Sequence, residues 1–319
     1  MRILNRTDIR ALVDVAGLVP AIGEAMRRVS EGKTDMPLRS MIRVGGGNLF
    51  GIMTGAMRDP DVHGAKLLSL YPDNPTHGRS SHCGVVVIFD AATGLPSACL
   101  DAAELTAIRT AAATALATDA LARKGASRLA LIGCGEQAHS HIAAMRAVRP
   151  ISSIVVWGRD PAKAAAFGRA NGTEVATSIA AAVAEADIVC TTTPATRPLL
   201  ERSMLHPGLH VNAVGASIPT MQEIATAIVP AVTWVTDYRP SLEAQAAEVI
   251  DARRMGLVAP DFVFTEIGEV LNGERPGRTS DSDVTLYRSL GVAAQDLAGA
   301  MAILALARAA GRGVEVDWS

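Results

Sequence analysis

The sequence predicts an α/β fold in which a parallel sheet forms from about residue 128 onward, after a first region of shorter strands. Apolar strand-like runs alternate with helical patterns over that second part, which is typical of a parallel sheet covered by helices on both faces. Hydrophobic residues make up 49% of the 319 residues and aromatic residues only 3%, so aliphatic side chains must build the cores. The length indicates about two domains.

The first region combines helices with short strands. Asp14 can cap a helix that Gly32 ends. A long alanine-rich helix follows the strands, from about Glu104 to Arg123, and Gly125 closes it. The strand-like runs are separated by Gly, Pro and Asp turns and cover residues 39–44, 48–53, 65–71, 85–90 and 95–100.

The second region supplies the alternating pattern. A final helix, from about Gly291 to Ala310, is expected to return to the first domain. We therefore predict one domain from residues 1–115 with 291–319, and a second from residues 116–290. The strands expected in the second domain cover residues 128–132, 153–157, 187–190, 209–214 and 232–237.

Composition and charge argue against several classes of protein. The net charge is −2 and no run of like charges is present, whereas a nucleic-acid surface needs a clustered basic patch. The first ten residues lack the apolar stretch of a signal peptide, and residues 297–307 are about half as long as a bilayer span. Four scattered cysteines and seven histidines form no metal-ligand pattern. We expect a cytoplasmic protein that binds neither nucleic acid, membrane nor metal.

The sharpest motif is the GxGxxA sequence at residues 133–138, directly after an apolar strand and before a helix. Its first glycine permits a tight turn, its second lets the backbone approach a pyrophosphate, and the alanine keeps the helix close to the sheet. The next strand completes a βαβ unit of the size that this motif requires. The sequence thus predicts a Rossmann domain, with a ligand-free glycine turn as the alternative. The expected cofactor-binding residues here are Gly133, Gly135, Glu136, Gln137 and Ala138.

The end of the following strand favours NADP(H) over NAD(H). NAD enzymes usually carry an acidic residue there, whereas this chain has Gly158 and then Arg159, whose guanidinium suits a 2′-phosphate. An ordinary exposed loop arginine is the alternative. Further strand ends are expected to contact the nicotinamide ribose and ring, although threonine after a strand is also a common cap. These positions are Thr191, Thr192, Val214, Gly215 and Ser217.

Seven short stretches, in order, resemble the ornithine cyclodeaminase/μ-crystallin family over nearly the whole chain. The resemblance implies an N-terminal α/β domain that binds substrate and forms a homodimer, is joined by the C-terminal helix, and carries the Rossmann domain as an insertion. The stretches are MPLR at 36–39, GAK at 64–66, SH at 81–82, LTAIRTAA at 105–112, IGCGEQA at 132–138, NAVGAS at 212–217 and TLYRSLG at 285–291.

The same resemblance implies roles for four polar residues. Arg109 lies among small helix neighbours, and the family's arginine at this position binds the substrate carboxylate. A solvated arginine on an amphipathic helix is the alternative. Arg39 would be a second carboxylate contact. Lys66 lies on a partly apolar strand face and is either an edge charge or a site residue with a tuned pKa. His82 would orient substrate or relay protons, or is a structural histidine.

Ornithine cyclodeaminases carry an aspartate at the position of Ser217 in this chain. A serine hydroxyl is a poor base, so this difference disfavours the cyclodeaminase reaction. The sequence resembles the imino-acid reductase branch, which reduces cyclic imines such as Δ1-pyrroline-2-carboxylate and Δ1-piperideine-2-carboxylate. We therefore predict an NADPH-dependent imine reductase that yields L-proline or L-pipecolate.

Three other functions are compatible with the sequence. They are a dehydrogenase that condenses a keto acid with an amine, an NADP-dependent small-ligand binder and, least favoured, an ornithine cyclodeaminase. The residues leave open the ring size of the substrate and the roles of Glu266 and Glu269, which lie three apart on an expected helix.

Overall fold

The computed structural model describes residues 1–318, and the contacts divide the chain into two compact units. The first unit contains residues 1–112 and the segment from residue 292 onward, and the second contains residues 113–291. The mixed α/β class predicted from sequence is confirmed. One helix, α3 (Ala102–Leu121), begins in the first unit and ends in the second, close to the predicted span of residues 104–123.

The first unit is built on an eight-stranded sheet with the order β16-β1-β7-β6-β5-β4-β2, in which β3 also pairs with β4. Neighbouring strands from β2 to β7 run antiparallel, as expected for short strands joined by turns. The strands are β1 (Arg2–Leu4), β2 (Thr34–Asp35), β3 (Ser40–Gly45), β4 (Asn48–Met57), β5 (Val62–Leu70), β6 (His82–Phe89), β7 (Pro96–Asp101) and β16 (Val314–Glu315).

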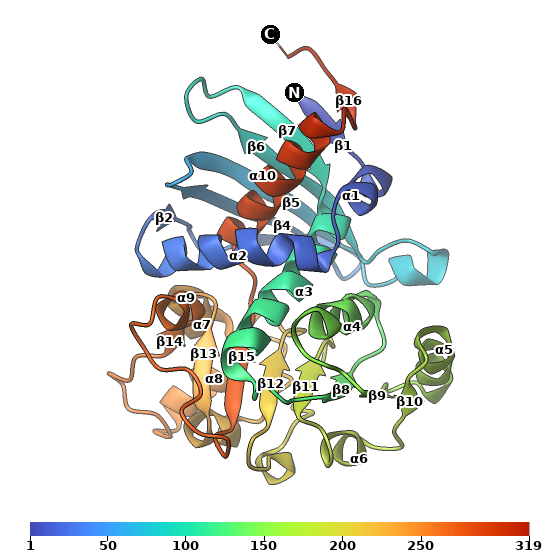
Figure 1. Ribbon diagram of the computed structural model, residues 1–319, viewed down its shortest axis with the longest axis vertical. Coiled ribbons are helices and arrows are strands. Elements are labelled where there is room, and N and C mark those ends of the chain that lie inside the picture. Colours follow the sequence, from blue (N-terminus) through green and yellow to red (C-terminus); the bar gives the residue numbers. More distant parts are fainter. Residues whose placement is uncertain (319) are drawn as a thin grey trace. The chain divides into compact units, whose positions relative to one another are not determined.

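Helices cover one side of this sheet. Helix α10 (Ala293–Ala309) crosses strands β4, β5 and β6 and contacts α2 (Val15–Ser30) (Figure 1). Asp14 caps α2 as predicted, because its carboxylate accepts a hydrogen bond of 2.9 Å from the backbone N–H of Gly17. The remaining helical segments are α1 (Arg6–Leu12) and the 3₁₀ helix η1 (Asn74–His77).

The second unit contains an eight-stranded sheet in which every pair is parallel, with the order β10-β9-β8-β11-β12-β15-β13-β14. Residues 129–132 of β8 are at most 1% exposed, so both faces of the strand are covered. The strands are β8 (Arg128–Ile132), β9 (Ser153–Trp157), β10 (Glu174–Val175), β11 (Ile188–Thr191), β12 (His210–Ala213), β13 (Thr233–Thr236), β14 (Thr265–Glu266) and β15 (Thr285–Arg288).

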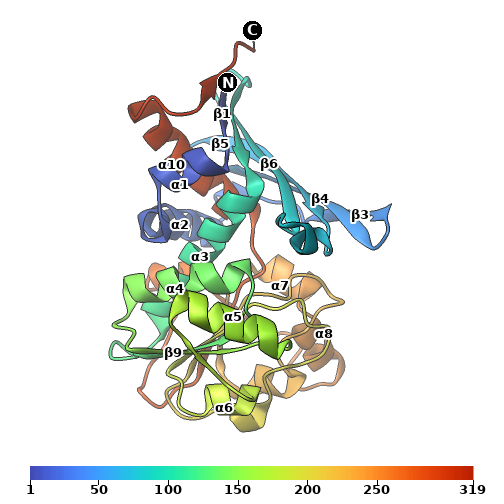
Figure 2. The same cartoon turned by 90° about the vertical axis from the view of Figure 1, so that its right-hand side faces the viewer.

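Helices α4 and α8 lie on opposite sides of this second sheet (Figure 2). Strand β8 pairs with β9 on one edge and with β11 on the other, so the strand order reverses at this point. Ligands of open parallel sheets bind at the carboxyl ends of the strands beside such a reversal. The helical segments are α4 (Glu136–Val148), α5 (Pro161–Asn171), α6 (Ile179–Val183), α7 (Arg239–Gln245), α8 (Ala247–Arg254), α9 (Ile267–Leu271), η2 (Arg202–Met204) and η3 (Thr226–Ala231).

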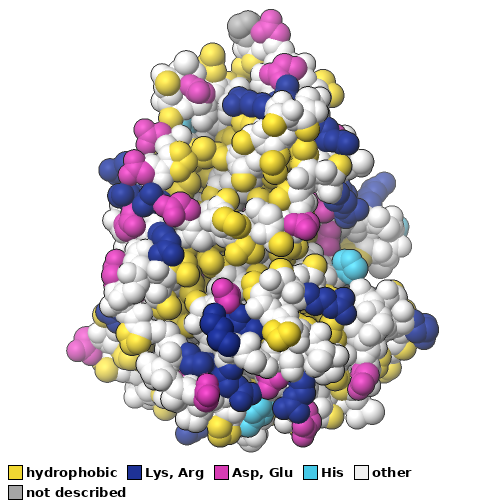
Figure 3. Space-filling view, in the orientation of Figure 1, with side chains coloured by type: hydrophobic (Ala, Val, Ile, Leu, Met, Phe, Trp, Pro, Cys, Tyr) yellow, Lys and Arg dark blue, Asp and Glu magenta, His cyan; other side chains and the backbone are white. Residues whose placement is uncertain are grey.

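The surface carries charges of both signs. Figure 3 shows lysine and arginine side chains interspersed with acidic ones over the face in view. Among residues 1–318, no helix has the length and apolar character to cross a membrane. The same residues contain no group of three or more His, Cys, Asp or Glu side chains arranged to hold a metal ion.

Candidate active site

The glycine motif lies at the carboxyl end of β8, beside the reversal of strand order. Gly133 has a φ of +123°, a conformation that other residues rarely adopt. A Cβ atom there would lie 2.7 Å from Oγ1 and 3.0 Å from the carbonyl oxygen of Thr192. Both the turn and the close approach of the neighbouring loop therefore require glycine.

Gly135 is the N-cap of α4, and it leaves open space beside the helix N-terminus. A Cβ atom at Gly135 would meet nothing within 4 Å, and this glycine has no side chain that could cap the helix. Ala138 is fully buried, which keeps α4 against the sheet. Within residues 1–318, Oε1 of Gln137 and Oγ1 of Thr192 are buried without a hydrogen-bond partner. An open, unshielded helix N-terminus fits the pyrophosphate of a dinucleotide.

The end of β9 places Gly158 and Arg159 as the sequence suggested. Gly158 faces Cys134, since a Cβ on Gly158 would lie 2.8 Å from the Cys134 sulfur. Arg159 is exposed, and within the described part of the chain it makes no hydrogen bond or ion pair. Asp160 caps α5 by accepting hydrogen bonds from the backbone of residues 162 and 163. The carboxylate of Asp160 is thus engaged in capping α5, whereas the guanidinium of Arg159 is accessible.

The next two segments are residues 191–193 at the end of β11 and residues 214–217 after β12. They are here called the cofactor loops because the sequence predicts cofactor contacts there. Their backbones are joined directly, because the N–H groups of Val214 and Gly215 donate to the carbonyl of Thr191 over 3.0 and 3.1 Å. Glu223, which the sequence analysis did not single out, lies behind both loops and is 1% exposed. The predicted residues Thr191, Thr192, Val214, Gly215 and Ser217 all lie on these loops.

In the first unit, two of the predicted polar residues are buried and share one counterion. Lys66 lies on β5, Arg109 lies on α3, and Asp296 lies on α10; they are 2%, 4% and 1% exposed. The Lys66 Nζ is 3.1 Å from Oδ1 and 2.9 Å from Oδ2 of Asp296. The Arg109 Nε donates to Oδ1 of Asp296 over 2.9 Å. We call these three residues the cation cluster.

Helix α10 supplies both partners of Arg109. Besides the contact with Asp296, Nη1 of Arg109 donates to Oε1 of Gln295 over 2.8 Å, so two side chains fix the plane of the guanidinium. Close packing allows this arrangement, since a Cβ on Gly299 would lie 2.9 Å from Leu105 Cδ1 on α3. Neither Gln295 nor Asp296 was predicted as a site residue. The signal was a carboxylate in the first turn of a largely apolar helix.

Charges and burial set the protonation of the cation cluster. Burial and the positive charge of Arg109 lower the pKa of Lys66 to about 7, although Asp296 acts in the opposite direction. Burial acts to raise the pKa of Asp296, but Arg109 and Lys66 hold it below the usual range. At neutral pH the cluster therefore contains one carboxylate, one guanidinium and a lysine that readily gains or loses its proton.

The other two predicted residues lie within electrostatic reach of the cation cluster. Arg39 is half-buried just before β3, and its positive charge also lowers the pKa of Lys66. His82 begins β6, and its Nδ1 lies 3.0 Å from the Ser81 hydroxyl. The His82 side chain retains an exposed surface, yet desolvation by nearby protein atoms and the charges of Lys66 and Arg109 lower its pKa. The ring is therefore neutral at physiological pH.

Glu266 and Glu269 have a structural explanation. They form the capping box of α9, in which the backbone N–H of Glu266 donates to Oε2 of Glu269 over 2.8 Å. Arg239 neutralises both, through an ion pair of 2.9 Å with Glu269 and one of 3.6 Å with Glu266.

Known proteins of similar sequence and structure share this architecture. The chain is 32% identical over 305 residues to a Δ1-pyrroline-2-carboxylate reductase of Bacillus cereus, covering 93% of this chain and 94% of that protein. An alanine dehydrogenase of Archaeoglobus fulgidus is 30% identical over 304 residues, which cover 94% of this chain and 93% of the dehydrogenase.

A solved structure matches almost the whole fold. The Δ1-pyrroline-2-carboxylate reductase of Thermococcus litoralis, in complex with NADH and L-proline, superimposes with a TM-score of 0.93 at 27% identity. The match covers 99% of this chain and 100% of that one. The sequence profile of the ornithine cyclodeaminase/mu-crystallin family matches residues 1–310. The chain therefore belongs to the ornithine cyclodeaminase/mu-crystallin family.

Proposed function

We propose that this protein reduces the C=N bond of a small cyclic imino acid with NADPH. The proposed substrates are Δ1-pyrroline-2-carboxylate and Δ1-piperideine-2-carboxylate, and the products are L-proline and L-pipecolate. The cation cluster is the observation that carries this proposal. With Lys66 protonated, its two cations face a single carboxylate, so one positive charge is left for the carboxylate of a substrate.

Arg109 and Arg39 have the role of holding the substrate carboxylate. The guanidinium of Arg109 is fixed by Asp296 and Gln295, so it presents a preset plane to the ligand. Burial strengthens such a contact because few water molecules compete with it. Fixing the carboxylate also fixes which face of the imine is presented, and positioning of this kind supplies much of the catalysis.

Lys66 has the role of governing the proton on the substrate nitrogen. An iminium is a better hydride acceptor than a neutral imine, and a group with a pKa near the working pH exchanges protons most effectively. Burial lowers the pKa of Lys66 to about 7. The reduced dinucleotide, when bound, supplies the hydride for the imine carbon. Ser217 offers no carboxylate base, which disfavours the cyclodeaminase reaction.

NADPH is the proposed cofactor because Arg159 is exposed and unpaired within residues 1–318 at the end of β9. The open N-terminus of α4 supports binding of the pyrophosphate. The structure of the T. litoralis relative is a complex with NADH and L-proline, so NAD(H) is the second candidate. A homodimer remains our expectation from the family resemblance, as does a cytoplasmic location.

The test is whether the purified protein oxidises NADPH in the presence of Δ1-pyrroline-2-carboxylate. The reaction is monitored through the loss of NADPH absorbance, and proline is identified as the product. NADH serves as the parallel cofactor. Δ1-Piperideine-2-carboxylate is assayed in the same way, with pipecolate as the expected product. Consumption of NADPH with proline or pipecolate as product supports the proposal, and no turnover with either cyclic imine contradicts it.

The alternative is an amino-acid dehydrogenase that forms its imine from a keto acid and an amine. The similarity to the A. fulgidus alanine dehydrogenase favours it over the remaining candidates. Pyruvate with ammonia or a primary amine is the matching substrate pair in the same assay. Activity with that pair alone would replace the cyclic-imine proposal, and dinucleotide binding without any turnover would indicate a ligand-binding protein.

A further inference from the structure

The carboxylate of Glu223 accepts five hydrogen bonds in the interior of the second unit. Oε1 accepts from the backbone N–H of Thr193 over 2.6 Å and from its hydroxyl over 2.7 Å. Oε2 accepts from the Thr191 hydroxyl over 2.9 Å and from the N–H groups of Gly215 and Ala216 over 2.7 and 3.1 Å. One side chain thus binds both cofactor loops at once.

The two cofactor loops lie so close together that no side chain larger than that of glycine fits between them at Gly215. A Cβ atom on Gly215 would lie 2.1 Å from the backbone nitrogen and 2.3 Å from the carbonyl oxygen of Thr193. The backbone of Glu223 is held as well, because its carbonyl accepts from the N–H groups of Leu199 and Leu200 over 2.8 and 3.0 Å. Glu223 therefore lies at a fixed point from which the positions of both loops are determined.

All five donors are neutral, and three are backbone N–H groups that cannot rotate away. A carboxylate can accept on both oxygens at once, whereas a carboxamide accepts on one and donates from the other. Burial raises the pKa of Glu223, whereas the hydrogen bonds from Thr193 and Thr191 act to lower it. The three backbone N–H donors on the two oxygens favour the ionised carboxylate, despite the cost of burying its charge. Such a cost is expected where it maintains a geometry that the protein uses.

We propose that Glu223 is a positioning residue that holds the two cofactor loops in the arrangement that receives the nicotinamide ribose and ring. This inference rests on the dinucleotide binding of the proposed function, but not on the identity of the imine. Thr192, on the loop of residues 191–193, approaches Gly133 of the glycine motif. A shift of this loop therefore also disturbs the pyrophosphate site.

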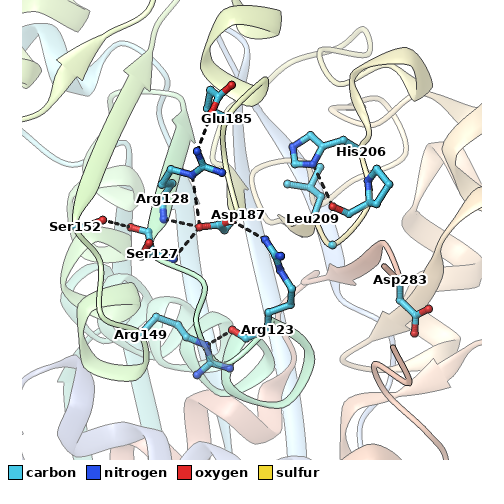
Figure 4. A network of polar contacts seen from close by, with 12 residues as sticks. Arg123, Ser127, Arg128, Arg149, Ser152, Glu185, Asp187, His206, Leu209 and Asp283 are labelled. Atoms are coloured by element: carbon cyan, nitrogen blue, oxygen red, sulfur yellow. Dashed lines mark hydrogen bonds and ion pairs between the residues drawn. The ribbon is translucent and has the colours of Figure 1, made fainter. Parts of the chain in front are cut away.

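Strand β11, whose carboxyl end Glu223 contacts through Thr191, offers a matched control at its amino end. Asp187 directly precedes β11 and is 6% exposed. Its carboxylate accepts from the N–H groups of Ser127 and Arg128 over 2.9 and 3.0 Å and pairs with Arg123 over 2.7 Å (Figure 4). Asp187 thus also accepts from two backbone N–H groups, here beside an arginine, at the amino end of the strand. This end lies away from the edge at which the dinucleotide is expected.

The experiment compares the dissociation constants of NADPH and NADH for the wild type, Glu223→Gln and Asp187→Asn by titration calorimetry without imine. The Glu223→Gln amide must turn a donor toward at least one backbone N–H, so we expect about a tenfold or greater weakening for both dinucleotides. Asp187→Asn should lower the melting temperature but keep both constants within about twofold of the wild type, since surrounding contacts at that end are remote from the ligand.

Unchanged dinucleotide affinity in Glu223→Gln would overturn the proposal, and so would an equal loss in Asp187→Asn. If Glu223→Gln does not fold, Thr193→Val replaces it, with Thr193→Ser as the conservative variant. Removal of that hydroxyl should weaken binding about threefold or more, and serine should restore it; no difference between the two would refute the role. A wild type that binds dinucleotide but reduces no imine would contradict the proposed function alone.

Discussion

Replacing Asp296 by asparagine should move the pH dependence of imine reduction toward acid. The substitution keeps the shape of the side chain but removes the only negative charge of the cation cluster. Lys66 then remains buried beside Arg109 and Arg39 without a counterion, and His82 on β6 contributes no charge at neutral pH. Burial and the neighbouring cations both act to lower the pKa of Lys66, so its pKa must fall below the wild-type value of about 7.

The magnitude follows from the contact distances. An opposite charge within 4 to 6 Å shifts a pKa by about 1 to 3 units, and here the ion pair measures 2.9 Å. A fall of about 2 units would leave roughly 1% of Lys66 protonated at pH 7, against about half in the wild type, which predicts a roughly 50-fold loss of kcat/KM. Activity should recover as the pH is lowered toward the new pKa of Lys66.

The assay is kcat/KM for the imine as a function of pH, for the wild type, Asp296→Asn and Lys66→Met. Asp187→Asn serves as the control for a buried carboxylate outside the cation cluster, and its pH midpoint should match the wild type. The reasoning would be refuted if the midpoint of the pH profile of kcat/KM were the same in Asp296→Asn as in the wild type. It would also be refuted if the fall of kcat/KM at high pH persisted in Lys66→Met.

Three further predictions concern cofactor choice, substrate binding and thiol reactivity. Arg159→Ala should raise the NADPH dissociation constant about tenfold or more and leave that of NADH unchanged, because only the 2′-phosphate contact is lost; titration with both dinucleotides tests this. Arg109→Lys should lower kcat/KM for the imine roughly 10- to 100-fold, because an ammonium cannot reproduce the planar fork; equal kinetics of the two proteins would contradict the carboxylate role. Cys190 is fully buried with its pKa raised by burial to about 12, so mass spectrometry should find it unmodified by iodoacetamide in the native protein and modified after unfolding.

The sequence was most informative where local chemistry decides the structure. The glycine motif, the apolar strand before it and the Asp160 cap are all specified by residues within a few positions of one another, and they were predicted where they are found. Helix α3 was predicted within two residues at each end because its alanine-rich pattern is long and uninterrupted.

Partners remote in sequence could not be predicted in the same way. Asp296 contacts Lys66 across 230 positions and Arg109 across 187, and no local pattern encodes such a pairing. The only clue was a carboxylate at the start of an apolar helix, which is equally expected of a helix N-terminus. Glu223 was harder to single out, because it lies in a segment of mixed polar and apolar residues that resembles an ordinary loop. Its donors come from other parts of the chain, which surround it only in the fold.

The discontinuous first unit has a consequence for how the protein is made. Its sheet is completed only when β16 pairs with β1, where the N-terminal amino group donates to the carbonyl of Val316 over 2.8 Å. Helix α10, which carries Asp296, follows the second unit in the chain and therefore leaves the ribosome after it. Lys66 and Arg109 are therefore synthesised long before their counterion, and the second unit can fold while they still face water. The cation cluster can become buried only after the second unit and α10 have both been synthesised.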